Sequence, residues 1–326
     1  MIENELRSST EAEVVAELRR RPAFVMVSHV KPDGDTLGAG LALGIALKRL
    51  GKRVAYFNQD PVPRNLRFLP DAEFVSREIP ADFPADTLYV FGDMSDHGRA
   101  GEFLPKVDRA NMLDIDHHLG NSHFGALNFV IPSETSTGTA VMRLFREMKT
   151  YIDSKIATCI LTTIMTDTGG FMHSNTTSET LDLAAELMRA GADKEQITEE
   201  IFGNKRVAAT RLLGRVIDEM HFAHDGKYCY SFVDDEMLKQ TGADGEDTED
   251  MVNVLRGQEG VDVAALFKSF DGEIRVSLRS SGRVNVQAAA ARLGGGGHFR
   301  ASGLTLHDTL NEAFAAVDAA LSAEGM

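Results

Sequence analysis

Several features that mark particular classes of protein are missing from this sequence. It has no tryptophan and only two cysteines, Cys159 and Cys229. Without a CxxC pair or a dense cysteine pattern, we expect neither a disulfide framework nor a cysteine-rich zinc site, and a reducing compartment fits. No stretch approaches the roughly 18 uninterrupted apolar residues of a membrane span. The amino-terminal segment lacks the apolar core of a signal peptide, so we expect a cytoplasmic protein with no membrane partner.

Positive charge is also scarce. The chain has 34 lysines and arginines against 49 aspartates and glutamates, which gives a formal net charge of −15. This average field repels a long nucleic acid, because binding one requires a basic surface that neutralises many phosphates. Divalent cations or a local basic patch can reverse the sign of the charge at one place. We therefore expect no long duplex nucleic acid as a partner, and a small substrate is easier to reconcile with the composition.

The residues that are present indicate a globular protein with two domains. The chain has 326 residues, of which 43% are hydrophobic and 25% charged, and one core rarely extends beyond about 250–300 residues. A short apolar run at 23–28 is followed by a polar loop, a helical stretch at 37–50 and a second strand-like run at 53–57. This βαβ order predicts a parallel sheet.

The alternation continues along the first three-fifths of the chain and then changes character at Lys227. Apolar runs of about six residues have the length of strands that are buried on both faces, and later segments combine strand-like runs with two helices. The expected strands lie at 87–92, 110–115, 227–233, 261–269 and 273–281, and the expected helices at 137–149, 153–166, 178–190, 284–293 and from Asp308 onward.

These segments predict an α/β fold. We expect a parallel-sheet amino-terminal domain with helices on both faces, plus a smaller α/β carboxy-terminal domain across a cleft. The predicted boundaries are 1–190 for the first domain, 191–220 for a helical linker and 221–326 for the second domain. The apolar helices of the first domain are also compatible with a homodimer.

Acidic and histidine residues gather in four places, each at the expected end of a strand or helix. Open parallel sheets bind ligands at the carboxyl ends of their strands. The first cluster follows the strand at 23–28, the second the strand at 87–92 and the third the strand at 110–115, while the fourth ends the helix at 153–166. They comprise, in order, His29, Asp33 and Asp35; Asp93, which precedes Asp96, His97 and Arg99; Asp116, His117 and His118; and Asp167.

Each cluster alone has an ordinary explanation. The first cluster suits a polar loop with an aspartate at a helix N-cap, Asp93 suits a solvated loop, and Asp167 suits a helix end that turns at Gly169 and Gly170. The third cluster is harder to explain in this way, because two buried histidines beside Asp116 are costly without a function. An Asp partner for a metal-binding histidine is common, and Asp116 is placed for that role.

Taken together, the clusters predict two divalent cations. Two ions about 3.5–4 Å apart, bridged by one carboxylate, can activate water and stabilise both the entering and the leaving oxygen in phosphoryl transfer. Mixed imidazole and carboxylate ligands favour Mn²⁺ over Mg²⁺, which prefers oxygen ligands in octahedral geometry. Zinc and Fe²⁺ remain alternatives.

In this pattern the sequence resembles the DHH phosphoesterase superfamily. The naming triplet is Asp116-His117-His118, and His29-x-x-x-Asp33-x-Asp35, Asp93 and Asp167 match the other acidic motifs in order and spacing. The segment GGGGHFRASG at 294–303 resembles the type 1 DHH-associated domain. The resemblance covers nearly the whole chain. It departs at Ala39, where the family often has Ser or Thr.

The resemblance implies a role for each matched residue. One metal would be bound by His29, Asp33 and Asp93, and the other by Asp35, Asp93, His117 and Asp167, with Asp93 bridging. His118 would contact the scissile phosphate or donate a proton, and Asp116 would support it. We therefore predict His118, Asp116 and Asp93 as catalytic residues.

The glycine run predicts a substrate site in the second domain. Four consecutive glycines expose backbone N–H groups that can form an anion-binding nest, although a flexible connector is the ordinary alternative. The resemblance favours binding. The predicted substrate-binding residues are Arg279, Ser280, Gly295, Gly296, Gly297, His298 and Arg300.

The resemblance is most specific to the branch often called nano-RNases. It implies a manganese-dependent hydrolase that degrades RNA of a few nucleotides to mononucleotides and dephosphorylates adenosine 3′,5′-bisphosphate to AMP. A hydrolase of linear signalling dinucleotides is an alternative. Polyphosphate hydrolysis is another, but that branch typically has a different carboxy-terminal domain. A nucleotide-sensing module without catalysis is the non-enzyme alternative.

Overall fold

The computed structural model describes residues 8–249, 251–270 and 272–326. The chain divides into two compact units, Met1–Asn204 and Lys205–Met326. The segment predicted as a linker, 191–220, spans the boundary between them. In the described ranges, no helix combines the length and the apolar character that crossing a membrane requires.

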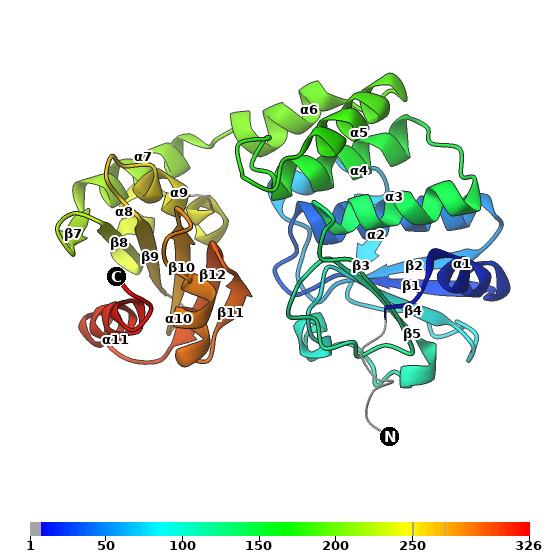
Figure 1. Ribbon diagram of the computed structural model, residues 1–326, viewed down its shortest axis with the longest axis horizontal. Helices are drawn as coiled ribbons and strands as arrows, with labels where there is room; N and C mark the ends of the chain where they lie inside the picture. The colour runs from blue at the N-terminus through cyan, green and yellow to red at the C-terminus, as the bar shows by residue number, and fades with distance from the viewer. Residues whose placement is uncertain (1–7, 250, 271) are drawn as a thin grey trace. The chain divides into compact units, whose positions relative to one another are not determined.

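The first unit is built around a parallel sheet with the strand order β3-β2-β1-β4-β5-β6 (Figure 1). Its helices and strands are α1 (Glu11–Arg20), β1 (Ala23–Val27), α2 (Gly34–Arg49), β2 (Arg53–Phe57), η1 (Arg64–Leu66), η2 (Ala72–Phe74), β3 (Val75–Ser76), β4 (Leu88–Gly92), η3 (His97–Ala100), η4 (Arg109–Asn111), β5 (Met112–Asp116), β6 (Leu127–Val130), α3 (Thr137–Met148), α4 (Ser154–Asp167), α5 (Ser178–Arg189), α6 (Lys194–Thr198) and the π-helix η5 (Glu199–Gly203).

The two faces of this sheet are covered differently. On one face, the buried side chains of α1, α2, α3 and α4 form one continuous core with alternate residues of β1, such as Phe24 and Met26. On the other face, Val25 and Val27 pack with Phe91 and with Ala100 of the short helix η3. The α-helical layer therefore lies on one side, and loops with η3 form the cover on the other.

The strand order places a reversal between β1 and β4. From β1 the sheet grows outward through β2 and β3 on one side, and through β4, β5 and β6 on the other. In open parallel sheets, the crevice at such a reversal is where ligands bind, at the carboxyl ends of the strands. The loops after β1 and β4 start at Ser28 and Asp93, and both therefore open onto this crevice.

The second unit contains a mixed sheet with the order β11-β12-β10-β9-β8-β7, in which β8 and β9 are parallel and the other pairs antiparallel. Helices α10 and α11 share a core with one face of this sheet, and α7, α8 and α9 share a core with the other. The elements are α7 (Val207–Asp218), β7 (His221–Ala223), β8 (Tyr228–Asp234), α8 (Asp235–Thr241), η6 (Gly245–Thr248), α9 (Met251–Arg256), β9 (Val263–Phe270), β10 (Glu273–Ser280), α10 (Val286–Arg292), β11 (Gly296–His298), β12 (Ala301–Leu306) and α11 (Leu310–Ser322).

The predicted α/β class is confirmed. The expectation of helices on both faces of the first sheet was wrong in detail, because the α-helices pack on one face while loops and the short helix η3 cover the other. Helix α2 begins at Gly34 rather than at residue 37, because the side chain of Asp33 accepts hydrogen bonds from the backbone N–H groups of Asp35 and Thr36 and caps the helix. The glycine run is not wholly a connector, since Gly296 and Gly297 belong to strand β11, which pairs with β12.

Candidate active site

The first cluster joins the loop after β1 to the end of β4. The Nε2 atom of His29 lies 3.7 Å from Oδ2 of Asp33 and 3.5 Å from Oδ2 of Asp93. Its Nδ1 atom lies 2.8 Å from the carbonyl oxygen of Val30, which orients the ring. His29 and Asp93 are buried, whereas the Asp33 side chain is 56% exposed. The cluster is therefore buried at His29 and Asp93 and accessible to solvent at Asp33.

Asp93 occupies an unusual backbone conformation. Its φ angle is 61°, in the left-handed region that few residues other than glycine adopt, though aspartate tolerates it better than most. The Asp93 backbone N–H donates to the carbonyl of Ile115 in the neighbouring strand, at 3.0 Å. This geometry directs one carboxylate toward two histidines: Oδ2 faces His29, and Oδ1 lies 3.6 Å from Nε2 of His117.

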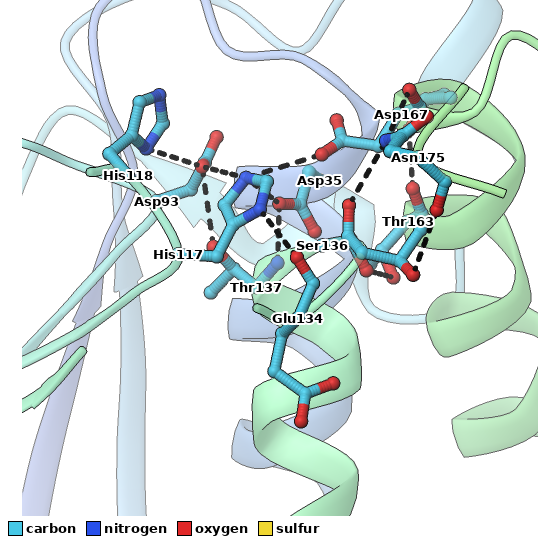
Figure 2. A network of polar contacts seen from close by, with 12 residues as sticks. Asp35, Asp93, His117, His118, Glu134, Ser136, Thr137, Thr163, Asp167 and Asn175 are labelled. Atoms are coloured by element: carbon cyan, nitrogen blue, oxygen red, sulfur yellow. Dashed lines mark hydrogen bonds and ion pairs between the residues drawn. The ribbon is translucent and has the colours of Figure 1, made fainter. Parts of the chain in front are cut away.

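The second cluster joins Asp35, His117 and Asp167 (Figure 2). Nε2 of His117 lies 3.7 Å from Oδ2 of Asp35 and 3.2 Å from Oδ2 of Asp167. On its other side, Nδ1 lies 3.3 Å from the Glu134 carbonyl oxygen. Residues from the loop after β5, from α2 and from α4, far apart in the sequence, thus meet around one imidazole nitrogen.

The amino-terminus of α3 supports this second cluster. The backbone N–H groups of Thr137 and Gly138 donate to the two carboxylate oxygens of Asp35, at 2.7 and 3.0 Å. The Thr137 hydroxyl donates to Oδ1 of Asp93 at 3.3 Å. Unpaired N–H groups at a helix amino-terminus stabilise negative charge, so α3 holds two of the carboxylates in place.

The third cluster is centred on Asp116. Its Oδ1 atom lies 2.7 Å from Nδ1 of His118 and accepts the backbone N–H of His117, while its Oδ2 atom accepts the Asn121 side-chain amide at 2.7 Å. Asp116 is fully buried and His118 nearly so. The contact of Nδ1 with Asp116 fixes the orientation of the His118 ring.

The pKa values in the site reflect burial working against close charges. Burial favours the neutral form of His29, but the carboxylates of Asp33 and Asp93 outweigh it and raise the pKa of His29 to about 10. Burial likewise opposes protonation of His118, yet Asp116 and Asp93 raise its pKa, with Arg99 acting in the opposite direction.

Two carboxyl groups show the repulsion directly. Desolvation raises the pKa of Asp35 well above its ordinary range, and the charges of Asp93 and Asp33 raise it further, although the N–H groups of α3 act against this. The pKa of Asp167 is raised well above its ordinary range, first by desolvation and then by the charges of Asp35 and Asp93. Carboxylates this close repel each other unless a cation lies among them.

The donor set fits divalent cations. In the described part of the chain, Nε2 of His29 is buried without a hydrogen-bond partner, while two carboxylates face it. A carboxylate oxygen and the lone pair of an imidazole nitrogen both accept, so only a proton or a metal ion can join them. The ligand atoms of His29, Asp33 and Asp93 lie within 4.8 Å of one another, as do those of Asp35, His117 and Asp167.

The structure places the predicted substrate-binding residues together around one end of the second sheet. Arg279 and Ser280 end β10, and the Arg300 carbonyl oxygen accepts the Ser280 N–H at 2.9 Å. The Ser280 hydroxyl is buried and donates to the Val284 carbonyl, so it shapes the turn before α10. His298 is exposed at the end of β11.

The glycines of this segment permit a close approach of β11 to β12. A Cβ atom on Gly295 would lie 2.3 Å from the Gly303 carbonyl oxygen, and one on Gly297, whose φ is 134°, would lie 2.6 Å from that of Ala301. Strand β11 is at the edge of the sheet, and an edge strand leaves alternate backbone groups outside the ladder. This edge is where the anion-binding nest predicted from the glycine run would lie.

Sequence reasoning missed several residues of the first unit that shape the site. These are the residues that hold the carboxylates and histidines through hydrogen bonds: Glu134, Thr137, Gly138 and Asn121. A signal existed for α3, since Ser136 precedes a helical stretch and forms a capping box with Thr139. Nothing in the sequence indicated that this helix would begin next to Asp35.

Comparison with known proteins adds two family matches. The model of the DHH family, N-terminal domain, matches residues 23–164, and that of the DHHA1 domain matches residues 225–323. The first match contains the motifs from His29 to His118, and the second contains the glycine run.

Individual proteins are similar over most of the chain. A protein of Thermus thermophilus named bifunctional oligoribonuclease and PAP phosphatase NrnA is 36% identical, over 87% of this chain and 84% of its own. The Bacillus subtilis protein of the same name is 25% identical, over 90% and 93%. The crystal structure of an exopolyphosphatase-related protein from Bacteroides fragilis superposes with a TM-score of 0.86 at 27% identity, over 96% and 95% of the two chains.

Proposed function

Because this chain belongs to the DHH family and carries a DHHA1 domain, we propose that it is a metal-dependent phosphoesterase with two related activities. It hydrolyses very short RNA to mononucleotides and removes the 3′-phosphate of adenosine 3′,5′-bisphosphate to leave AMP. The family resemblance seen in the sequence is confirmed, and the similar proteins named for these activities match over more than four-fifths of this chain.

The observation that carries the proposal is the shared carboxylate. Asp93 directs one oxygen to His29 and the other to His117, at 3.5 and 3.6 Å. One metal is assigned to His29, Asp33 and Asp93, and the other to Asp35, Asp93, His117 and Asp167. Four carboxylates and two imidazoles favour Mn²⁺.

Bound at these residues, two divalent cations would supply Lewis acidity that polarises a phosphate and lowers the pKa of water. The side chains and backbone of the protein orient these groups and supply the proton. The α3 amino-terminus orients Asp35, and Asn121 and the Asp116 carboxylate orient His118. With Nδ1 bonded to Asp116, His118 can carry a proton on Nε2 and deliver it to the leaving oxygen.

The second unit supplies substrate recognition in this proposal. Arg279, His298 and Arg300 provide charge or donors, and Gly295–Gly297 provide backbone N–H groups for a phosphate. These groups read a phosphate and not a base sequence, which suits a substrate that varies in sequence. We further propose that the protein acts in the cytoplasm, without a long duplex as partner.

The test uses the purified chain with Mn²⁺ and three substrates in parallel: a 5′-labelled RNA dinucleotide, adenosine 3′,5′-bisphosphate and polyphosphate. The Asp93→Asn variant removes the shared carboxylate. Asp182→Asn makes the same change of charge at an exposed position of α5 and serves as the matched control.

We expect mononucleotides from the first substrate and AMP from the second, both abolished in Asp93→Asn and retained in Asp182→Asn. Turnover of polyphosphate alone would reassign the substrate class. Silence on all three substrates with Mn²⁺, Mg²⁺ and Zn²⁺ would contradict the proposal and favour a sensing module.

A further inference from the structure

Arg99 lies in η3, the short helix that follows Asp93, and its backbone is fixed to the loop that carries His29. The Arg99 carbonyl oxygen accepts the backbone N–H of Val30 at 2.8 Å, and the Arg99 N–H donates to the Asp96 carbonyl at 3.1 Å. The next residue, Ala100, is buried in the core beneath the sheet. The start of the Arg99 side chain is therefore held at a constant position relative to the first metal cluster.

A close contact at Gly101 strengthens this placement. Gly101 has a φ of 87°, and a Cβ atom there would lie 2.1 Å from Oε1 of Gln59 and 2.8 Å from Cγ1 of Val30. The same Gln59 oxygen accepts the Glu102 N–H at 2.9 Å. The segment after η3 is thus pressed against the loops that follow β1 and β2, and η3 has little freedom to move away from the site.

Arg99 is partly buried, and the described residues give its guanidinium group no hydrogen bond or ion pair. Its charge nevertheless acts at two points of the cluster. Desolvation and His29 have the larger effects on the pKa of Asp33, and the Arg99 charge lowers that pKa. Burial and Asp116 have the larger effects on the pKa of His118, and the Arg99 charge lowers that pKa as well. What places Arg99 next to the cluster is its backbone contact with Val30, the residue that follows His29.

The charges of the site explain why a positively charged side chain is needed there in addition to the metal ions. The assigned metal ligands include four aspartates, whose charges two divalent cations would only balance. The other charges that act most strongly on these residues are carboxylates and imidazoles. A substrate phosphate is negative, and its charge concentrates on non-bridging oxygens during transfer. An arginine can bind two such oxygens at once.

We propose that Arg99 binds a non-bridging oxygen of the phosphate that is hydrolysed, and that it stabilises the charge on this oxygen in the transition state. This inference rests on the proposed function, because it concerns the phosphate of the same reaction. It assigns a substrate contact to the loop after β4, in addition to the contacts proposed for the second unit.

The test compares Arg99→Met, Arg99→Lys and Arg109→Met. Arg109 is the matched control: its side chain donates to the Gly125 and His123 carbonyls, and it sits in η4 at the amino end of β5, opposite the end that carries Asp116. Three quantities are measured in the full chain: Mn²⁺ binding, binding of inorganic phosphate in the presence of Mn²⁺ by calorimetry, and kcat and KM for the RNA dinucleotide.

We expect Arg99→Met to lower kcat by about 100-fold or more, in the range seen for loss of one charge-stabilising donor. Phosphate binding should weaken at least about 10-fold, while Mn²⁺ binding stays within about two-fold of wild type. Arg99→Lys should recover only part of the loss, because a point charge cannot replace the two-pronged donor. Arg109→Met should match wild type in all three.

Two outcomes separate this inference from the proposed function. If the wild-type chain turns over the dinucleotide and Arg99→Met matches Arg109→Met, the assignment of Arg99 is wrong and the proposed function stands. If the wild-type chain binds phosphate but does not turn over the dinucleotide, and Arg99→Met binds phosphate more weakly, the assignment stands and the proposed function is wrong. Loss of Mn²⁺ binding in Arg99→Met would overturn the assignment by making Arg99 a structural residue.

Discussion

Nε2 of His29 and Oδ2 of Asp93 face each other at 3.5 Å in the interior of the first unit. The other ring nitrogen of His29 is directed at the Val30 carbonyl. Two acceptors cannot bond to each other, so the pair is stable only with a proton or a cation between them. This geometry is the one expected of two ligands of a single cation, and the proposed metal site has several measurable consequences.

Replacement of His29 by alanine should remove one metal and leave the other. Only the first cluster uses His29, whereas the second retains Asp35, His117 and Asp167. We expect the number of Mn²⁺ ions bound per chain to fall by about one, and hydrolysis of short RNA to fall by at least about 100-fold. Calorimetric titration of Mn²⁺ checks this. The exposed His307 provides the control variant His307→Ala, and unchanged stoichiometry in His29→Ala would show that the ligand assignment is wrong.

Replacement of Asp167 by asparagine should stabilise the chelator-treated protein while it abolishes activity. Asp167 carries a raised pKa caused by desolvation and then by Asp35 and Asp93, so its ionisation at neutral pH opposes folding. Relief of one pKa unit of such repulsion is worth about 1.4 kcal/mol, or roughly 3–6 °C in the melting temperature of a domain this size.

The measurement for Asp167→Asn is thermal unfolding in EDTA and again in Mn²⁺. The variant should unfold at a higher temperature than wild type in EDTA, and it should gain less from Mn²⁺ because a ligand is lost. A lower melting temperature in EDTA would mean that Asp167 stabilises the fold through a contact other than a metal.

The sequence was sufficient to place the predicted metal ligands close together, because parallel strands end at a common edge. Asp93 and His117 each follow a strand whose apolar run could be read directly, and the same reasoning placed His29. The supporting bonds could not be read in this way. The N–H groups that hold Asp35 come from Thr137 and Gly138, 102 and 103 residues away along the chain, and only the packing of α2 against α3 brings them together.

Strands without an apolar run were the part of the fold that sequence patterns did not reveal. Strand β12, Ala301–Leu306, contains a glycine and exposed residues, and β11 is two glycines and a histidine. Both strands exist because β10 offers an edge to β12 and β12 in turn offers one to β11. Their pairing depends on tertiary context rather than on local propensity.

A buried carboxyl group in β5 should make stability depend on pH. Asp114 is fully buried, and its oxygens have no hydrogen-bond partner among the described residues. Burial, and then the charge of Asp116, raise the pKa of Asp114 well above its ordinary range. The folded protein therefore keeps a proton that the unfolded chain has lost above about pH 4, so rising pH favours unfolding until the folded pKa is passed.

Asparagine at position 114 cannot ionise and should remove this pH dependence. We expect the free energy of unfolding of Asp114→Asn, relative to wild type, to increase as the pH rises from 5 to 8. Urea unfolding at several pH values checks the sign. A constant difference over this range would show that the carboxyl group of Asp114 is ionised in the folded protein as it is in the unfolded chain.

Replacement of Gly297 by alanine should distort the edge of the second sheet. The backbone there has a φ of 134°, and a Cβ atom would lie 2.6 and 2.7 Å from backbone atoms of Ala301 and Ser302. We expect a loss of about 1–3 kcal/mol from strain of this kind and a higher KM for adenosine 3′,5′-bisphosphate.

Gly296 is the matched control for stability, since a Cβ atom there meets nothing within 4 Å. Thermal unfolding should leave Gly296→Ala near wild type and lower the melting temperature of Gly297→Ala. Equal melting temperatures would show that β11 does not depend on its close approach to β12.

The left-handed backbone at Asp93 limits how this enzyme can be redesigned. A φ of 61° admits glycine, asparagine and aspartate with little strain and strongly disfavours branched or bulky side chains. Among these, only aspartate places two anionic oxygens between the histidines of neighbouring loops. The backbone at Asp167, which ends a regular helix, therefore accepts many residue types in an attempt to change the metal preference. The backbone at position 93 accepts very few.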